Sequence, residues 1–132
     1  MQDDFNSAVH HQLSGRLEHA AQLYRALLAR NPEHPDALHL LGVVAYQQGD
    51  HQQAAELIGR AIALRPGVAS FYANLAEVYR ATGQLDRAVS CCRTALALQP
   101  GSPEAANNLG LALLGCPYSL DLRTPWTCEG QG

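Results

Sequence analysis

Residues 35–68 read PDALHLLGVVAYQQGDHQQAAELIGRAIALRPGV, and residues 69–102 read ASFYANLAEVYRATGQLDRAVSCCRTALALQPGS. The two stretches share a repeat period of 34 residues. The same period continues before residue 35 and after residue 102. The register is carried by Gly15, Gly49 and Gly83, by Ala20, Ala54 and Ala88, by Pro32, Pro66 and Pro100, and by Leu41, Leu75 and Leu109. A fixed period of this length, shared by four residue types, indicates a chain of stacked structural repeats.

Each residue type in the register has a physical role. A glycine between two helical stretches can adopt the backbone angles that end one helix. Small residues allow two helices to cross closely, and the proline after each second stretch ends it. Between these markers the apolar residues recur at helical spacing. The sequence therefore predicts helix pairs at about 3–14 with 17–30, 35–48 with 51–64, and 69–82 with 85–98, followed by a seventh helix at 103–114.

The composition limits the fold and the function. Of the 132 residues, 47% are hydrophobic but only 6% are aromatic, which favours closely packed helices and an all-α fold. The net charge of −3 is spread along the chain, so nucleic-acid binding is not expected. No apolar stretch is long enough for a membrane span, and no signal peptide is recognisable. We expect a cytoplasmic protein whose four cysteines are reduced thiols.

The register resembles the tetratricopeptide repeat (TPR) consensus. The resemblance is carried by Leu41-Gly42, Tyr46, Gly49-Asp50, Ala54, Ala61 and Pro66, and again by Leu75-Ala76, Tyr79, Gly83, Ala88, Ala95 and Pro100. It implies a right-handed α-solenoid of helix-turn-helix hairpins. The TPR domain would cover residues 1–114, with repeats at about 1–34, 35–68 and 69–102 and a partial repeat at 103–114.

A second resemblance is to the repeats that precede the catalytic domain of O-linked N-acetylglucosamine transferases. In that family an asparagine before the leucine of each first helix holds the backbone of a bound peptide. Asn6, Asn74 and Asn108 match this position, whereas Leu40 does not. The resemblance thus implies a row of peptide-binding amides that is interrupted in the second repeat.

These observations predict a module that binds an extended peptide or a partner protein on a concave face formed by the first helices. The expected face comprises His39, Val43, Tyr46, Asn74, Glu77, Arg80, Asn107, Asn108 and Leu111, with Leu109 in the core beneath it. One alternative is the substrate-recruiting repeat segment of a glycosyltransferase whose catalytic domain is absent here. Another is a self-assembling scaffold.

The register breaks after Leu114, where Pro117, Leu122 and Glu129 replace the expected glycine and alanines. We therefore expect residues 115–132 to be irregular or disordered. The break suggests a chain that is truncated or out of frame after this point. Alternatively, Tyr118, Leu120, Leu122 and Trp126 fold back as an improvised cap. Self-association through the uncapped end is compatible with both hypotheses.

The sequence predicts neither catalysis nor a cofactor. No nucleophile elbow, phosphate-binding glycine loop or H-E-x-x-H motif occurs. The six histidines show no spacing typical of metal ligands, so no metal site is expected. Glu77 and Arg80 are three residues apart on one helix, which is typical of a solvated ion pair. Cys92 is expected to be a small core residue.

Overall fold

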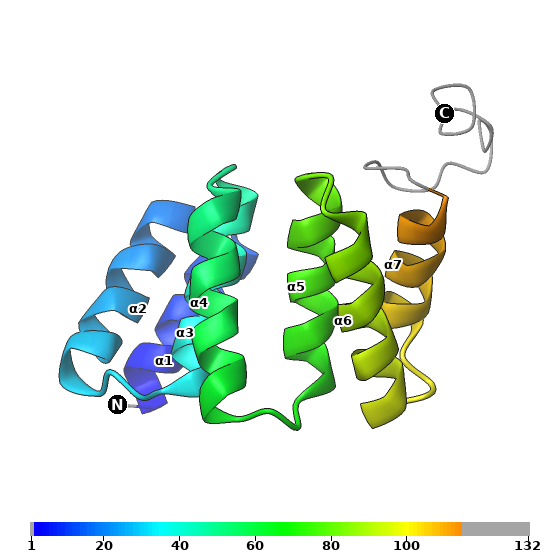
Figure 1. Ribbon diagram of the computed structural model, residues 1–132. Coiled ribbons are helices and arrows are strands. Elements are labelled where there is room, and N and C mark those ends of the chain that lie inside the picture. The colour runs from blue at the N-terminus through cyan, green and yellow to red at the C-terminus, as the bar shows by residue number, and fades with distance from the viewer. Residues whose placement is uncertain (1, 115–132) are drawn as a thin grey trace. The chain divides into compact units, whose positions relative to one another are not determined.

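The computed structural model describes residues 2–114, with side chains from residue 4 onward (Figure 1). Over this range all regular structure is helical. The seven helices are α1 (Gln2–Leu13), α2 (Leu17–Arg30), α3 (Pro35–Gln47), α4 (His51–Leu64), α5 (Ala69–Ala81), α6 (Leu85–Leu98) and α7 (Pro103–Leu113). Every boundary lies within one residue of the predicted one. The segment expected to be irregular, 115–132, and the alternative cap within it lie outside the described residues.

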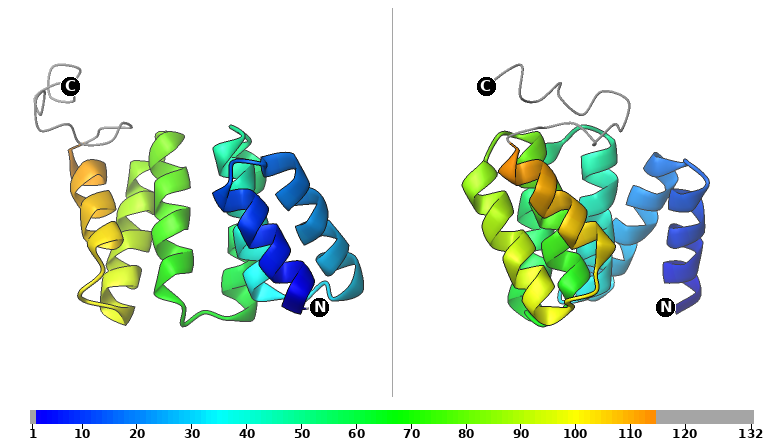
Figure 2. Two further views of the ribbon diagram at one scale, coloured as in Figure 1. Left: turned by 180° about the vertical axis from the view of Figure 1, so that it is seen from behind. Right: turned by 90° about the vertical axis from the view of Figure 1, so that its right-hand side faces the viewer.

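The chain divides into two compact units. Met1–Pro66 contains α1 to α4, and Gly67–Gly132 contains α5 to α7 in its described part. In the first unit α1 packs on α2 and α3 on α4, and α2 also contacts α3. In the second unit α7 contacts both α5 and α6, as the views of Figure 2 show. Helical hairpins thus form the elementary structure of both units.

The turn inside each hairpin depends on the glycine of the register. Gly15, Gly49 and Gly83 have φ angles of 83°, 88° and 78°, a left-handed conformation that residues with a side chain rarely adopt. After Gly49 the Asp50 N–H donates to the Ala45 carbonyl at 2.8 Å, which closes the end of α3. The Asp50 side chain then accepts from the Gln53 N–H at 3.2 Å and begins α4.

The first helices α3 and α7 begin with proline, whose missing N–H has no helical partner at that position. The preceding residue caps each helix. His34 Nδ1 accepts from the Ala37 N–H at 3.1 Å, and Ser102 Oγ accepts from the Ala105 N–H at 3.2 Å. The Pro-containing loops therefore end one hairpin and start the next helix.

Small residues let the helices of a hairpin approach each other. In the first unit a Cβ atom added to Gly42 of α3 would lie 2.7 Å from Ile58 Cγ1 and 3.2 Å from the Ala54 carbonyl oxygen of α4. In the second unit Ala73, Ala95 and Ala105 form a buried cluster flanked by Tyr72 and Leu96. Cys92 is fully buried in α6, which confirms its predicted place in the core.

Candidate functional site

The predicted binding residues lie on α3 in the first unit and on α5 and α7 in the second, and together we call them the first-helix surface. On α3, Val43 and Tyr46 are half-buried and keep part of their side chains accessible. His39 is only 7% exposed. Its burial lowers its pKa to about 4, although Asp36 acts in the opposite direction. His39 is therefore a neutral imidazole near neutral pH.

A chain of side-chain hydrogen bonds links α1, α2 and α3 in the first unit. The Tyr24 hydroxyl donates to Gln12 Oε1 at 2.8 Å, and Gln12 Nε2 donates to Gln47 Oε1 at 3.2 Å. Burial raises the pKa of Tyr24 to about 12, so the hydroxyl keeps its proton. Neither Gln12 nor Gln47 is among the residues predicted from the sequence. Their only sequence signal is a polar amide near the end of successive first helices.

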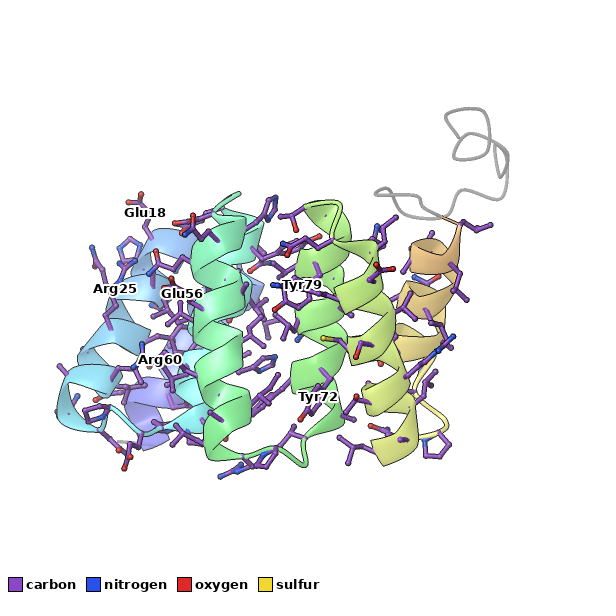
Figure 3. All side chains as sticks on the ribbon, in the orientation of Figure 1. Glu18, Arg25, Glu56, Arg60, Tyr72 and Tyr79 are labelled. Atoms are coloured by element: carbon purple, nitrogen blue, oxygen red, sulfur yellow. The ribbon has the colours of Figure 1, made fainter. Side chains whose placement is uncertain are left out.

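Asn74 and Glu77 are half-buried on α5. Tyr79, labelled in Figure 3, is half-buried on the same helix, and the Arg87 guanidinium lies 5.8 Å from the centre of its ring. Arg80 is only 4% exposed. The expected Glu77 and Arg80 pair is thus not a fully solvated one, because its arginine is a buried residue.

The two asparagines of α7 have different environments. Asn107 is exposed, whereas Asn108 is 6% exposed and its Nδ2 donates to the Ala73 carbonyl of α5 at 3.1 Å. Asn108 therefore connects two first helices within the second unit. Its amide nitrogen is engaged inside the protein, which differs from the role implied by the resemblance.

The leucines of α7 also differ from expectation. Leu111, expected on the surface, is 1% exposed, and Leu109, expected in the core, is only half-buried. Leu111 and Ala112 lie one turn from Asn108 on the side of α7 that is covered. Leu109 lies on the side that would face a second helix, and among residues 2–114 no second helix follows α7. We therefore leave Leu111 out of the proposed binding surface.

Other groups of possible chemical interest lie elsewhere. The rings of His11 and His19 stack at 5.4 Å between centroids, and His10 lies 6.1 Å from His11. Within the described range no group of three or more His, Cys, Asp or Glu side chains is arranged to hold a metal ion. Burial raises the pKa of the Cys92 thiol to about 11, so this thiol is unreactive at neutral pH.

Two hollows on the described part of the first unit include no predicted site residue. One of about 250 Å³ is lined by Glu18, Ala21, Gln22, Arg25 and Gln48, and one of about 290 Å³ by Pro32, Glu33, Leu38, Arg60, Ala63 and Leu64. Figure 3 shows Glu18 and Arg25 on α2 and Arg60 on α4. Among the described helices none is long and apolar enough to cross a membrane.

Comparison with known proteins gives a consistent result. Two family models described as tetratricopeptide repeat match residues 8–69 and 45–114. Tetratricopeptide repeat protein 7A of Homo sapiens is 34% identical over 92 residues, which are 70% of this chain and 11% of that protein. The chain therefore spans about a tenth of the length of this relative.

Two solved structures extend the comparison. An O-GlcNAc transferase mutant of Thermobaculum terrenum matches with a TM-score of 0.82 and 35% identity, over 85% of this chain and 22% of that one. The first TPR of Spaghetti, bound to an HSP90 peptide, matches with a TM-score of 0.82 over 85% of this chain and 89% of that one. At 18% identity the second likeness shows the fold alone.

Proposed function

The chain belongs to the tetratricopeptide repeat family, and from this premise we propose that it binds an extended segment of a partner protein on its first-helix surface. Repeats of this family are typically interaction modules rather than catalysts. We therefore propose that the chain itself catalyses no reaction and uses no cofactor. The cytoplasmic location stays a prediction of the sequence.

The observation that carries the proposal is that each unit keeps residues of different character partly or fully exposed on the first-helix surface. Val43 and Tyr46 offer apolar and aromatic contact area on α3, and Asn74 and Asn107 offer amides on α5 and α7. An amide side chain has both a donor and an acceptor, which match one peptide unit whatever its side chain is. These residues thus favour recognition of a peptide backbone with a few apolar contacts.

The charges on this surface argue against recognition of a terminal carboxylate. The chain contains no lysine, and Arg80, the cation of the predicted set, is a buried side chain. A binding surface made by so few repeats is also smaller than the ~1,200 Å² at the lower end of stable interfaces. We therefore expect weak, broad binding.

The proposal is tested by capture followed by a quantitative assay. Proteins retained by the immobilised chain are identified, and a labelled peptide from the best candidate is titrated with the chain by fluorescence anisotropy. The double variant Asn74→Ala with Asn107→Ala should weaken binding by ~1–3 kcal/mol, because two peptide-directed amides are lost. Asn108 is left intact because its side chain supports the fold.

The matched control removes two exposed polar side chains of second helices, by Gln53→Ala together with Arg93→Ala. This control should bind the peptide as the parent does, and both variants should melt within a few degrees of it. An equal loss of affinity in the control, or unchanged affinity in the asparagine variant, would place the binding surface elsewhere.

One observation favours a more specific role for the same surface. The similarity to the Thermobaculum terrenum transferase, together with the asparagines at positions 6 and 74, supports a repeat segment that recruits substrates for a glycosyltransferase. This alternative is tested at the level of the gene. A continuous reading frame from the repeats into a nucleotide-sugar transferase domain would establish it, and a frame without one would remove it.

A further inference from the structure

One side of α7 is apolar and uncovered among the described residues. We name Ala106, Leu109, Gly110 and Leu113 the open face of α7. Ala106 and Gly110 are exposed, Leu109 is half-buried, and Leu113 is 61% exposed. In the right-hand view of Figure 2, α7, in orange, lies in front of α5 within its unit. Among residues 2–114 no helix lies on this face.

The corresponding positions of α3 are covered. Equivalent positions of α3 and α7 are two repeat periods of 34 residues apart. The open face of α7 therefore corresponds to Leu38, Leu41, Gly42 and Ala45. All four are buried, and α3 packs closely on α4. The two glycines show the difference directly. A Cβ atom on Gly42 would meet α4 at 2.7 Å, whereas a Cβ atom on Gly110 would meet nothing within 4 Å.

The hairpins of this chain also show what kind of surface fits such a face. Each second helix buries a small residue, a larger apolar residue four positions later and a further apolar residue three positions after that. The three sets are Ala20, Tyr24 and Leu27; Ala54, Ile58 and Ala61; and Ala88, Cys92 and Ala95, each residue at most 1% exposed. The small residue allows the close crossing, and the other two fill the space between the helices.

We infer that the open face of α7 is a docking site for an amphipathic helix with an alanine, an apolar residue four positions on and a small or apolar residue seven positions on. The occupant is a helix from another polypeptide segment and repeats the packing of α4 on α3. This site is separate from the first-helix surface, and its ligand is a helix instead of an extended peptide.

A second folded copy of the chain is a poor occupant. The helix surface that would pack on the open face of α7 is the inner face of α2, α4 or α6. In each of these helices the inner face is already buried in the core of the same copy. A folded copy therefore has no such helix to offer. An extended peptide is also a poor occupant, because the open face is a single helix side without amides to bond a peptide backbone.

The test uses the chain's own second helix as the probe. A synthetic peptide with the sequence of residues 50–65 is titrated into the ¹⁵N-labelled full-length chain, and amide chemical shifts are followed. We expect saturable shifts confined to residues 103–114, with a dissociation constant on the order of 0.1–1 mM because the free peptide must first become helical. The peptide with Ala54→Leu should bind at least tenfold more weakly.

Variants of the chain make the assignment specific. Gly110→Leu fills the crossing point and should weaken binding of the parent peptide at least tenfold. It should fold, because the space around Gly110 is open. The matched control is Gly59→Leu, which changes a helical glycine of α4 that also has open space around it, and should leave binding unchanged. Leu113→Glu is a second variant on the same face.

Three results of the peptide titration would overturn the inference. The first is the absence of shifts at about 1 mM peptide, and the second is an affinity for the peptide in Gly110→Leu and Leu113→Glu that equals that of the parent chain. The third is a set of shifts in α3, which would mean that the peptide exchanges with α4. Sedimentation across a dilution series completes the test, since dimerisation that Gly110→Leu abolishes would assign the face to a second copy.

Discussion

At the scale of single residues, Asn107 and Asn108 show how neighbouring side chains take different roles. They are the same residue type on one helix, yet Asn108 bonds the Ala73 carbonyl and Asn107 is exposed. Adjacent positions on a helix point about 100° apart, so only one of them can face α5. The structural role therefore belongs to Asn108.

We predict that Asn108→Ala lowers the free energy of unfolding by about 1 kcal/mol, because a buried hydrogen bond between α7 and α5 is lost. Asn107→Ala should change it by less than about 0.5 kcal/mol, as expected of an exposed residue without such a bond. Urea titrations of both variants and the parent measure the difference. Equal stability of the two variants would show that the Asn108 bond contributes nothing.

The sequence could not distinguish these two asparagines. The period fixes which residues belong to a first helix, but the side that turns toward the neighbouring helix depends on how the helices pack. The same reason explains why the predictions for Leu109 and Leu111 were wrong. Leu109 was expected to be buried and Leu111 to be exposed, but Leu111 is the more buried of the two. It also explains why Gln12 was not predicted, since its hydrogen bonds with Tyr24 and Gln47 join three different helices. Contacts between helices determine which side chains remain exposed at the site. The spacing of residues within one helix does not reveal these contacts.

At the scale of helices, the sequence was a reliable guide. The residues that set the boundaries act locally, since a left-handed glycine ends α3 at Gly49 and a proline begins α7 at Pro103. These residues act on the backbone next to them, so their effect on a helix boundary does not depend on distant parts of the chain. This is why every helix boundary agrees with its prediction within one residue, while the exposure of surface residues does not.

The helices also provide a matched test of close packing. Gly42→Ala should destabilise the protein by ~1–3 kcal/mol, because the added methyl group meets Ile58 of α4 at less than van der Waals distance. Gly110→Ala has open space and should stabilise α7 by up to about 1 kcal/mol, through the higher helix propensity of alanine.

Thermal melts of the two variants beside the parent give the sign of each change. A stabilising Gly42→Ala would mean that α3 and α4 lie farther apart than the structure places them. A strongly destabilising Gly110→Ala would mean that another segment already covers the open face of α7.

At the scale of the whole molecule, buried titratable groups limit stability on both sides of neutral pH. His39 has a pKa lowered by burial to about 4, whereas an ordinary histidine has 6.5. Burial raises the pKa of Cys92 from 9.0 to about 11 and that of Tyr24 from 10.0 to about 12. In each case the folded protein favours the neutral form of the side chain, and the charged form favours unfolding.

The sign of the pH dependence follows from proton binding. Between pH 6.5 and pH 4 the unfolded chain holds more protons at His39 than the folded chain, so stability falls as the pH decreases through this window. Above pH 9 the unfolded chain loses protons from Cys92, and above pH 10 from Tyr24, before the folded chain does. The contribution of these three groups to stability therefore falls again in alkaline solution and is largest between about pH 6.5 and pH 9.

We predict that the free energy of unfolding drops by about 2 kcal/mol between pH 7 and pH 5 through His39. Urea titrations at closely spaced pH values measure this drop in the parent and in His39→Gln, which cannot be protonated. The variant should show a flatter acidic limb whatever its stability at pH 7, because the group that takes up the proton is gone. Cys92→Ala is the internal control, since it should flatten only the alkaline limb. An acidic limb of the same slope in His39→Gln and the parent would mean that other groups cause the loss of stability in acid.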